Sequence, residues 1–311
     1  MYRLLVFSIF LVISACTKSA QPKTYQRLVT NTHDILYKVI KNDQSISVVG
    51  GFVWTHGYEK TYDLALNLIS TDTFSDKGLF DVCVTSSGDK IAVGTDGYLF
   101  EKKKNELQWK FHRLTNWDIL DHVFVTATGF IAYGGKAYET GYIYHLNHDF
   151  ETDSILYFGH EISKIFHNDS GRLISVGWGQ IDVSDDGGYS WQTLDIKGDF
   201  FVSGLFINEK TGFTIGANGT ILKTIDGGSS WSIHNSKIGG ASFSSFRSIV
   251  YIDDTLFILG NKGKLWQSND NGENWTFIEL PDAIDIYDLV KSENQSYLLV
   301  GSSGTFAKIT L

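Results

Sequence analysis

The sequence is poor in cysteine and proline. Two residues of each type occur among 311 residues, and no stretch has the low complexity of a linker. This even composition favours one large domain or a repeat array. Cys16 is assigned to lipid attachment below, which leaves Cys83 as the single thiol and excludes an internal disulfide. Its neighbours Val82 and Val84 predict that Cys83 is a small core residue.

Cationic side chains are also scarce. Lysine and arginine number 26 against 35 aspartates and glutamates, so the formal net charge at pH 7 is -9. Loss of an N-terminal signal containing Arg3 makes the charge one unit more negative. An acidic protein gains nothing from polyanions, because phosphate recognition depends on cationic side chains. We therefore expect neither nucleic acid nor anionic lipid as a ligand.

The motifs of several enzyme classes are missing. The sequence contains no Gly-x-Ser-x-Gly elbow, phosphate-binding loop or His-Glu-x-x-His motif. His145 and His148 are three residues apart, a spacing that points them to opposite faces of a strand and makes them a poor metal pair. We expect both at the surface, and we predict no catalytic residue, no metal and no cofactor.

The N-terminal residues have the features of an export signal. Arg3 precedes an apolar run at residues 4–13 that is too short to span a membrane. The following Ser14-Ala15-Cys16 resembles the end of the bacterial lipobox, whose cysteine takes a diacylglycerol. An ordinary cleaved signal with a chance cysteine is the alternative. We predict a signal peptide at 1–15, a lipidated tether at 16–24 and, because Thr17 rather than Asp follows the cysteine, an outer-membrane location.

One eight-residue pattern occurs three times. It reads Ser/Thr-x-Asp-x-Gly-x-x-Trp, and its repeated positions are Ser184, Asp186, Gly188 and Trp191; Thr224, Asp226, Gly228 and Trp231; and Ser268, Asp270, Gly272 and Trp275. Its side chains suit a hairpin tip, where Asp and Ser/Thr bond the amides of the turn and Gly accepts a positive φ. The pattern resembles the Asp-box of the BNR repeat, a structural staple. The glycine register does not match an EF-hand calcium loop.

A second marker, an apolar run ending in glycine, recurs about every 40 residues, the length of a four-stranded propeller blade. Its glycines are Gly50, Gly94, Gly134, Gly177, Gly216, Gly260 and Gly301. Seven markers predict an all-β fold, a seven-bladed β-propeller of four-stranded antiparallel blades occupying residues 25–311.

The last blade lacks its outer strand, since the chain ends with the third strand at residues 305–311. Residues 25–30 resemble the outer strands of other blades. We predict that this N-terminal strand completes the last blade and closes the ring, which leaves no open sheet edge there.

The repeat of blades five and six, Gly216 to Leu222 running into Thr224 to Trp231, is similar to that of the photosystem II assembly factors of plants and cyanobacteria. The similarity covers blades two and four to seven well, and blades one and three poorly. It implies a periplasmic or lumenal assembly factor that holds a protein partner during assembly.

Sialidases carry the same boxes and offer an enzymatic alternative. Their catalysis needs three arginines around the substrate carboxylate. After removal of the signal, this chain retains Arg27, Arg113, Arg172 and Arg247, of which the last alone begins an inner strand. Propeller sialidases also have six blades. The few arginines, their positions and the seven predicted blades therefore argue against sialidase chemistry.

Two connections between second and third strands are expected to be long loops, at residues 51–60 and 135–142. Both combine aromatic residues with Glu, as recognition loops do. The predicted partner-binding face comprises Trp54, His56, Tyr58, Glu59, Trp117, Tyr138, Glu139, Trp178 and Arg247. The alternative is that these rings plug the mouth of the ring.

The sequence thus predicts a membrane-anchored lipoprotein of the cell envelope that acts as a non-catalytic, protein-binding scaffold or assembly factor. A glycan-binding or glycan-cleaving surface protein is the alternative hypothesis.

Overall fold

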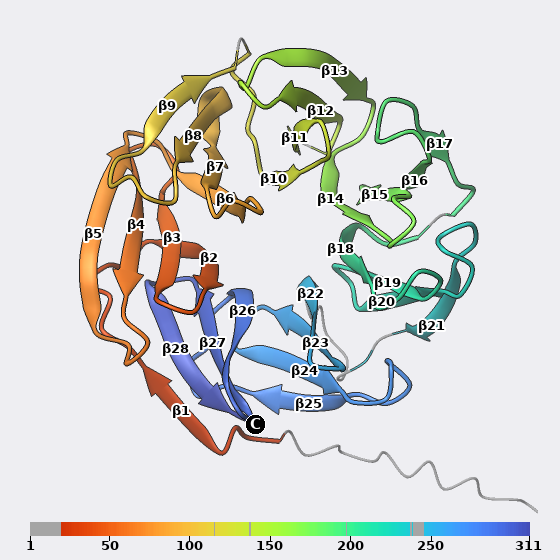
Figure 1. The fold of residues 1–311 in the computed structure, drawn as a ribbon. Helices are drawn as coiled ribbons and strands as arrows, with labels where there is room; N and C mark the ends of the chain where they lie inside the picture. Colours follow the sequence, from red (N-terminus) through yellow and green to blue (C-terminus); the bar gives the residue numbers. More distant parts are fainter. Residues whose placement is uncertain (1–19, 115, 137, 197, 237, 239–245) are drawn as a thin grey trace, which may run out of the picture.

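A computed structural model describes residues 20–114, 116–136, 138–196, 198–236, 238 and 246–311. Seven four-stranded antiparallel sheets form a ring around a central channel (Figure 1). The predicted seven-bladed propeller is confirmed. Cys16 and the predicted signal at 1–15 lie outside the described residues.

The blades follow one another along the chain, each running from the channel outward. Blade one contains β2 (Ile35–Lys41), β3 (Ile46–Phe52), β4 (His56–Tyr62) and β5 (Leu68–Ser75). Blade two contains β6 (Leu79–Val84), β7 (Lys90–Gly94), β8 (Tyr98–Lys102) and β9 (Lys110–Arg113), with the short 3-10 helix η1 (Thr95–Gly97) between β7 and β8. Blade three contains β10 (His122–Val125), β11 (Gly129–Lys136), β12 (Thr140–Asn147) and β13 (Thr152–Phe158).

The remaining blades follow the same order. Blade four contains β14 (Ile162–His167), β15 (Leu173–Gly177), β16 (Ile181–Ser184) and β17 (Gln192–Thr193). Blade five contains β18 (Phe201–Phe206), β19 (Gly212–Gly216), β20 (Thr220–Thr224) and β21 (Ser232–Ser236). Blade six contains β22 (Phe246–Ile252), β23 (Thr255–Gly260), β24 (Lys264–Ser268) and β25 (Thr276–Glu279). Blade seven contains β26 (Ile286–Glu293), β27 (Ser296–Gly301), β28 (Thr305–Thr310) and β1 (Thr24–Arg27).

The repeated glycine lies where the chain enters each blade. A Cβ added to Gly94 would lie 2.1 Å from the carbonyl oxygen of Gly78, and one added to Gly177 would lie 1.8 Å from that of Glu161. Any side chain there would collide with the incoming backbone. The same close approach to the incoming backbone recurs at Gly50, Gly134 and Gly301, whereas Gly216 faces the Asp199 side chain, so the marker reports this crossing in five blades.

The inner strands carry a β-bulge at the same level of the channel. The register shifts between Leu36 and Lys38 in blade one, and at the equivalent step in blades two, four, five, six and seven. A bulge turns its extra residue away from the regular pleat. The extra residues are Tyr37, Phe80, Ser163, Val202, Arg247 and Tyr287, and all of them line one cavity at the mouth of the channel.

The N-terminal strand closes the ring. Strand β1 pairs antiparallel with β28, with Thr24 opposite Thr310 and Arg27 opposite Ala307. This confirms the predicted closure, although the strand covers 24–27 rather than 25–30. Beyond Arg27 the Leu28 amide still donates to the Phe306 carbonyl at 2.8 Å, and then the chain leaves the sheet.

Apolar packing between neighbouring blades forms the core. Leu36 and Val48 of blade one pack with Leu298, Val300 and Phe306 of blade seven, all of them buried. Closure therefore buries side chains as well as pairing backbone. Cys83 is partly buried against such a cluster between blades two and three, and burial raises the pKa of its thiol to about 12.

The chain enters the ring from its outer rim. Ala20 forms a parallel bridge with Ile278 of β25, the outer strand of blade six. Its amide donates to the Phe277 carbonyl at 2.8 Å, and its carbonyl accepts from the Glu279 amide at 3.1 Å. The first described residue is therefore fixed outside β25, the outer strand of blade six.

Candidate binding face at the channel mouth

Propeller topology fixes which connections share a face. Second and fourth strands of a blade run in the same direction, so the hairpins after second strands and the links between blades lie at the same end of the ring. Trp54, Trp117, Tyr138 and Trp178 stand in these connections and are 59%, 71%, 54% and 49% exposed. Glu139 is exposed in the same hairpin as Tyr138.

The two connections expected to be long loops are extended hairpins. Strands β3 and β4 pair as far as Phe52 opposite His56, and β11 and β12 as far as Lys136 opposite Thr140. The extra residues lengthen the sheet, which is consistent with their alternating aromatic and polar positions. The loop assignment of these segments is wrong.

Three members of the predicted face therefore lie on β4 rather than in a loop. Tyr58 is 4% exposed and packs in the core between blades one and seven, and Glu59 is 1% exposed. His56 is partly exposed, with Nε2 2.8 Å from Asp34 Oδ2. Tyr58 and Glu59 thus have almost no surface with which to contact a partner.

Glu59 is instead the centre of a buried ion cluster. Its carboxylate pairs with Lys90 and, at 3.0 Å, with Lys102. Burial opposes ionisation of Glu59, but the two ammonium groups outweigh burial and lower its pKa. Lys90 and Lys102 come from blade two, so this glutamate joins two blades and serves the fold.

The structure brings together two predicted aromatics and adds a third. The ring centroids of Tyr138 and Trp178 are 4.7 Å apart, and that of Phe200 lies 5.8 Å and 5.2 Å from them. We call these three residues the aromatic platform. They come from blades three and four and from the link into blade five, and half of the Tyr138 and Trp178 surface is exposed.

Phe200 was missed by sequence reasoning. It precedes β18 in a link between blades, and only its bridge to Trp178 places it beside the other rings. A single apolar residue next to a strand has no sequence signal that separates it from core residues.

Two carboxyl groups hold the hairpin that carries the platform. Glu161 Oε2 accepts from the Tyr138 amide at 2.9 Å, and Asp121 Oδ2 accepts from the Gly135 amide at 3.4 Å. Burial raises the pKa of Asp121 to about 7, and the nearby carboxylates of Glu161 and Asp81 add to the shift. Both carboxyl groups line the cavity at the channel mouth.

That cavity has a volume of about 720 Å³, and we call it the channel-mouth cavity. Tyr138 and Phe200 of the platform line one wall. Arg247, Tyr37 and Tyr287 line another, where the Arg247 guanidinium carbon lies 4.5 Å from the Tyr287 ring centroid. Arg247 also donates to Asp285 Oδ2 at 3.0 Å, so its charge is already paired.

Below this level the channel contains a ring of polar residues, one from each inner strand: Lys38, Asp81, His122, Lys164, Ser203, Ser248 and Asp288. Lys38 Nζ lies 3.8 Å from Asp81 Oδ1 and 3.6 Å from Asp288 Oδ2. His122 Nδ1 lies 3.2 Å from Asp81 Oδ2. These contacts link blades seven, one, two and three across the channel.

The other predicted aromatics stand apart from the platform. The Trp54 ring centroid lies 5.9 Å from Lys77 Nζ, and the Trp117 ring lies 4.0 Å from the Arg113 guanidinium carbon. The exposed aromatic residues among the predicted ones therefore share a face of the ring but do not form one patch, and Tyr58 and Glu59 lie in the interior.

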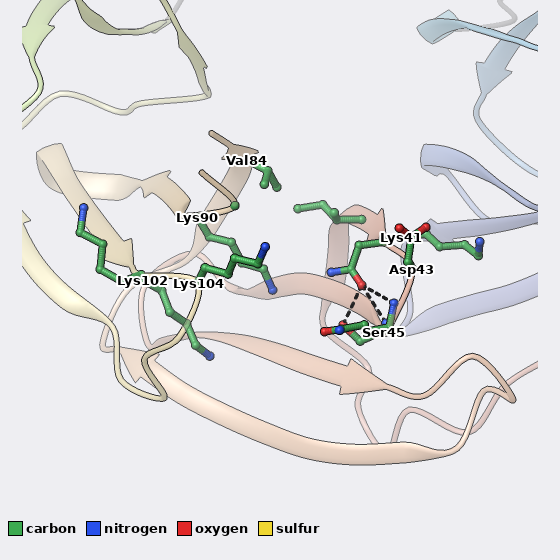
Figure 2. A pocket seen from close by; sticks show the side chains of 12 residues that line it. Lys41, Asp43, Ser45, Val84, Lys90, Lys102 and Lys104 are labelled. Atoms are coloured by element: carbon green, nitrogen blue, oxygen red, sulfur yellow. Dashed lines mark hydrogen bonds between the residues drawn. The ribbon is translucent and has the colours of Figure 1, made fainter. Parts of the chain in front are cut away.

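The opposite face contains a lysine-rich pocket of about 490 Å³ between blades one and two (Figure 2). Its lining includes Lys41, Lys90, Lys102, Lys103 and Lys104. Lys90 and Lys102 are paired with Glu59, and Lys103 with Asp89 and Glu101. Because acidic partners neutralise most of these lysines, the pocket presents little net positive charge to an anion.

The three Asp-boxes have one hydrogen-bond pattern. In the first, Ser184 Oγ donates to Asp186 Oδ1 at 2.8 Å and accepts from the Gly188 amide at 2.9 Å, while the Ser190 amide donates to Asp186 at 2.9 Å. Hydrogen bonds from Ser190 lower the Asp186 pKa to about 2. The same bonds recur at Thr224 and Ser268.

Each box also touches the preceding blade. A Cβ on Gly228 would lie 2.6 Å from Ile174 of blade four, and one on Gly272 would lie 2.9 Å from Phe213 of blade five. At the first box, His145 of blade three has Nε2 3.3 Å from the Gly187 carbonyl. His145 is buried, which corrects its expected surface position.

Candidate catalytic and metal groups are dispersed. In the described part of the chain, Arg27, Arg113, Arg172 and Arg247 lie on blades seven, two, four and six, so no arginine triad forms there. No cluster of three or more His, Cys, Asp or Glu side chains suited to a metal occurs among those residues. Nor does any helix within them have the length and apolarity to cross a membrane.

Comparisons with known proteins match this architecture. A family model described as photosynthesis system II assembly factor YCF48 matches residues 183–285, which contain the three Asp-boxes. The photosystem II assembly lipoprotein Ycf48 of Synechococcus sp. (strain CC9902) is 26% identical over 132 residues, 40% of this chain and 39% of that protein. The match therefore spans about two fifths of that relative's length.

Solved structures share the whole ring. A YCF48 bound to D1 peptide aligns with a TM-score of 0.71 and 14% identity, covering 94% of this chain and 97% of that one. A catalytically inactive virginiamycin B lyase from Staphylococcus aureus with quinupristin aligns with a TM-score of 0.72 and 11% identity, covering 93% and 99%. At these identities the likeness concerns the fold. With the family match, it identifies the chain as a seven-bladed Asp-box (BNR-repeat) β-propeller that resembles the photosystem II assembly factors.

Proposed function

We propose that this chain is a lipid-anchored, non-catalytic scaffold of the cell envelope that binds a protein partner through its channel-mouth face. The aromatic platform carries the proposal. Exposed Tyr and Trp rings on rigid connections, next to a cavity, are typical of binding hot spots. In a chain that resembles assembly factors, they indicate a surface that holds another protein.

The similar propeller that was solved with D1 peptide suggests the kind of partner. By analogy, we propose that an extended segment of a protein lies across the mouth of the channel. The identity of the partner does not follow from this analogy, because the sequence identity is 14%.

We also propose that Cys16 carries the lipid after removal of residues 1–15, that residues 16–24 form the tether, and that residues 25–311 form the propeller domain. The end of this tether is held on the ring, where Ala20 contacts blade six and Thr24 pairs in blade seven. Thr17 after the cysteine supports outer-membrane sorting. The relative from Synechococcus is named a lipoprotein, which supports lipid attachment as well.

Partner capture tests the proposed face. Detergent-solubilised membranes of the source organism are incubated with the immobilised protein, and bound proteins are quantified for wild type and for Tyr138→Ala with Trp178→Ala. Loss of exposed anchors should weaken capture about tenfold or more while thermal stability changes little. The control is Tyr189→Ala, a half-exposed aromatic in an Asp-box turn on the opposite face.

Unchanged capture by the platform variant would contradict the proposed face. A parallel glycan array distinguishes the alternative ligand: specific sugar binding that the same variant abolishes, without protein capture by the wild type, would identify a glycan-binding surface instead.

A further inference from the structure

Two carboxyl groups at the channel mouth lack a cationic partner. Asp121 and Glu161 each use one oxygen to hold the β11–β12 hairpin, and among the described residues neither forms an ion pair. Three other carboxylates around the channel are paired with cations: Asp285 with Arg247 at 3.0 Å, and Asp81 and Asp288 with Lys38 at 3.8 and 3.6 Å.

Lys164, which also lines the cavity, does not form an ion pair with Asp121 or Glu161. Lys164 belongs to the ring of polar residues in the channel. Burial lowers the pKa of Lys164, and among the carboxylates Asp81 opposes this effect most. The negative charges of Asp81 and Asp288 balance the positive charges of Lys38 and Lys164. The ring of polar residues in the channel is therefore nearly neutral apart from His122. Glu161 and Asp121 therefore stand above this ring without a compensating cation among the described residues. Burial is the main cause of the raised pKa of Asp121, and the carboxylates of Glu161 and Asp81 add to it.

Aromatic faces stand beside these carboxyl groups. Glu161 contacts the platform twice through backbone, since its amide donates to the Tyr138 carbonyl and its carbonyl accepts from the Trp178 amide, both at 3.3 Å. An arginine side chain binds well where its guanidinium stacks on an aromatic ring and donates to a carboxylate. Lysine is attracted by the same groups as a point charge.

We propose that the aromatic platform, with Glu161 and Asp121, receives a basic side chain of the partner, with arginine preferred over lysine. The proposal rests on the proposed function, because it specifies what the captured segment must present. The stem of the side chain lies along Tyr138 and Trp178, and its charged end meets the two carboxyl groups at the cavity edge. The partner segment is therefore extended and carries a basic residue where it crosses blades three and four.

A small probe tests this site without the partner. N-acetyl-L-arginine methylamide is titrated into the folded protein, and the Trp178 indole N–H is followed by NMR after assignment with Trp178→Phe. We expect a saturable shift of this resonance. N-acetyl-L-citrulline methylamide, which has nearly the same shape without the charge, should bind at least about fivefold more weakly.

Matched variants assign the effect to the carboxyl group. Glu161→Gln keeps an oxygen for the Tyr138 amide but removes the charge, so the hairpin is retained and the arginine probe should bind at least about fivefold more weakly. Asp149→Asn removes an exposed charge at the other end of blade three, outside the cavity and the predicted face, and should leave binding unchanged. Equal affinity for the arginine and citrulline probes, or an unaltered affinity in Glu161→Gln, would overturn the proposal.

The two proposals fail in different ways. If platform variants abolish partner capture but arginine does not bind, the face is correct and the basic contact is wrong. If arginine binds with the expected charge dependence but platform variants capture the partner normally, the cation site stands and the proposed binding face falls.

Discussion

Some buried charged residues inside this ring are compensated by side chains from another blade. Glu59 is nearly inaccessible, yet its pKa is lowered because Lys90 and Lys102 approach it from the next blade. Breaking such a buried pair by removing one partner typically costs about 3–5 kcal/mol. Asp121 is the contrasting case, with a raised pKa and no cation in the described structure.

This contrast predicts a pH dependence for Asp121→Asn. The pKa of Asp121 in the folded state is about 7, against 3.8 for an unperturbed aspartate, so between these values the folded protein holds a proton that the unfolded chain releases. Wild type therefore loses stability as pH rises through this window. The Asn variant has no such loss, and its free energy of unfolding relative to wild type should rise by about 2 kcal/mol from pH 5 to pH 8. Urea unfolding at both pH values measures it.

Glu139→Gln is the control for that measurement, since Glu139 is exposed and should show a difference from wild type that is nearly independent of pH. A pH-independent Asp121→Asn difference would mean that the Asp121 carboxyl group titrates normally.

At the level of the element, the Asp-box acts as a joint between blades as well as a turn. The glycine at its fifth position has a positive φ in all three copies and faces the preceding blade. The hydrogen bonds from Ser/Thr and Asp hold the tip so that this glycine can approach closely.

Two alanine substitutions distinguish the contact with the preceding blade from the backbone strain of the turn. Gly228→Ala combines a φ of +86° with a Cβ 2.6 Å from Ile174, and should lower the free energy of unfolding by about 2–4 kcal/mol. Gly187→Ala has a φ of +77° with open space around the Cβ, and should cost only the backbone term of about 1–2 kcal/mol. Thermal unfolding of both variants tests the difference. Equal losses would show that contact with the preceding blade is unimportant.

Blade number and closure were predictable because their causes are local and repeated. In five blades the repeated glycine meets the backbone that enters the blade, so the spacing of neighbouring markers such as Gly94 and Gly134 reports the length of one blade. The site was only partly predictable. Tyr138, Trp178 and Phe200 come from different blades, and only the closed ring brings them together. Residues 51–60 looked like a loop because the lysines that compensate Glu59 lie in another blade.

At the level of the whole molecule, pairing of β1 with β28 fixes the N-terminal segment to the ring. This has a consequence for attachment. With the proposed lipid on Cys16, Cys16→Ser should abolish incorporation of labelled fatty acid and shift the protein from the membrane to the soluble fraction or leave it unprocessed. The folded propeller should be unaffected, because the described contacts of the ring begin at Ala20. Continued membrane retention of an unacylated, processed protein would rule out lipid anchoring at this cysteine.

The fixed position of Ala20 outside β25 also constrains how the ring meets a bilayer. Three residues separate Ala20 from Cys16, and the four steps between consecutive Cα atoms span at most about 14 Å. With the proposed lipid on Cys16, the point of attachment therefore lies at the rim beside blade six, and we expect the axis of the propeller to lie close to the plane of the membrane. In that posture neither end of the channel is pressed against lipid, and the aromatic platform faces sideways, toward neighbours embedded in or resting on the same bilayer.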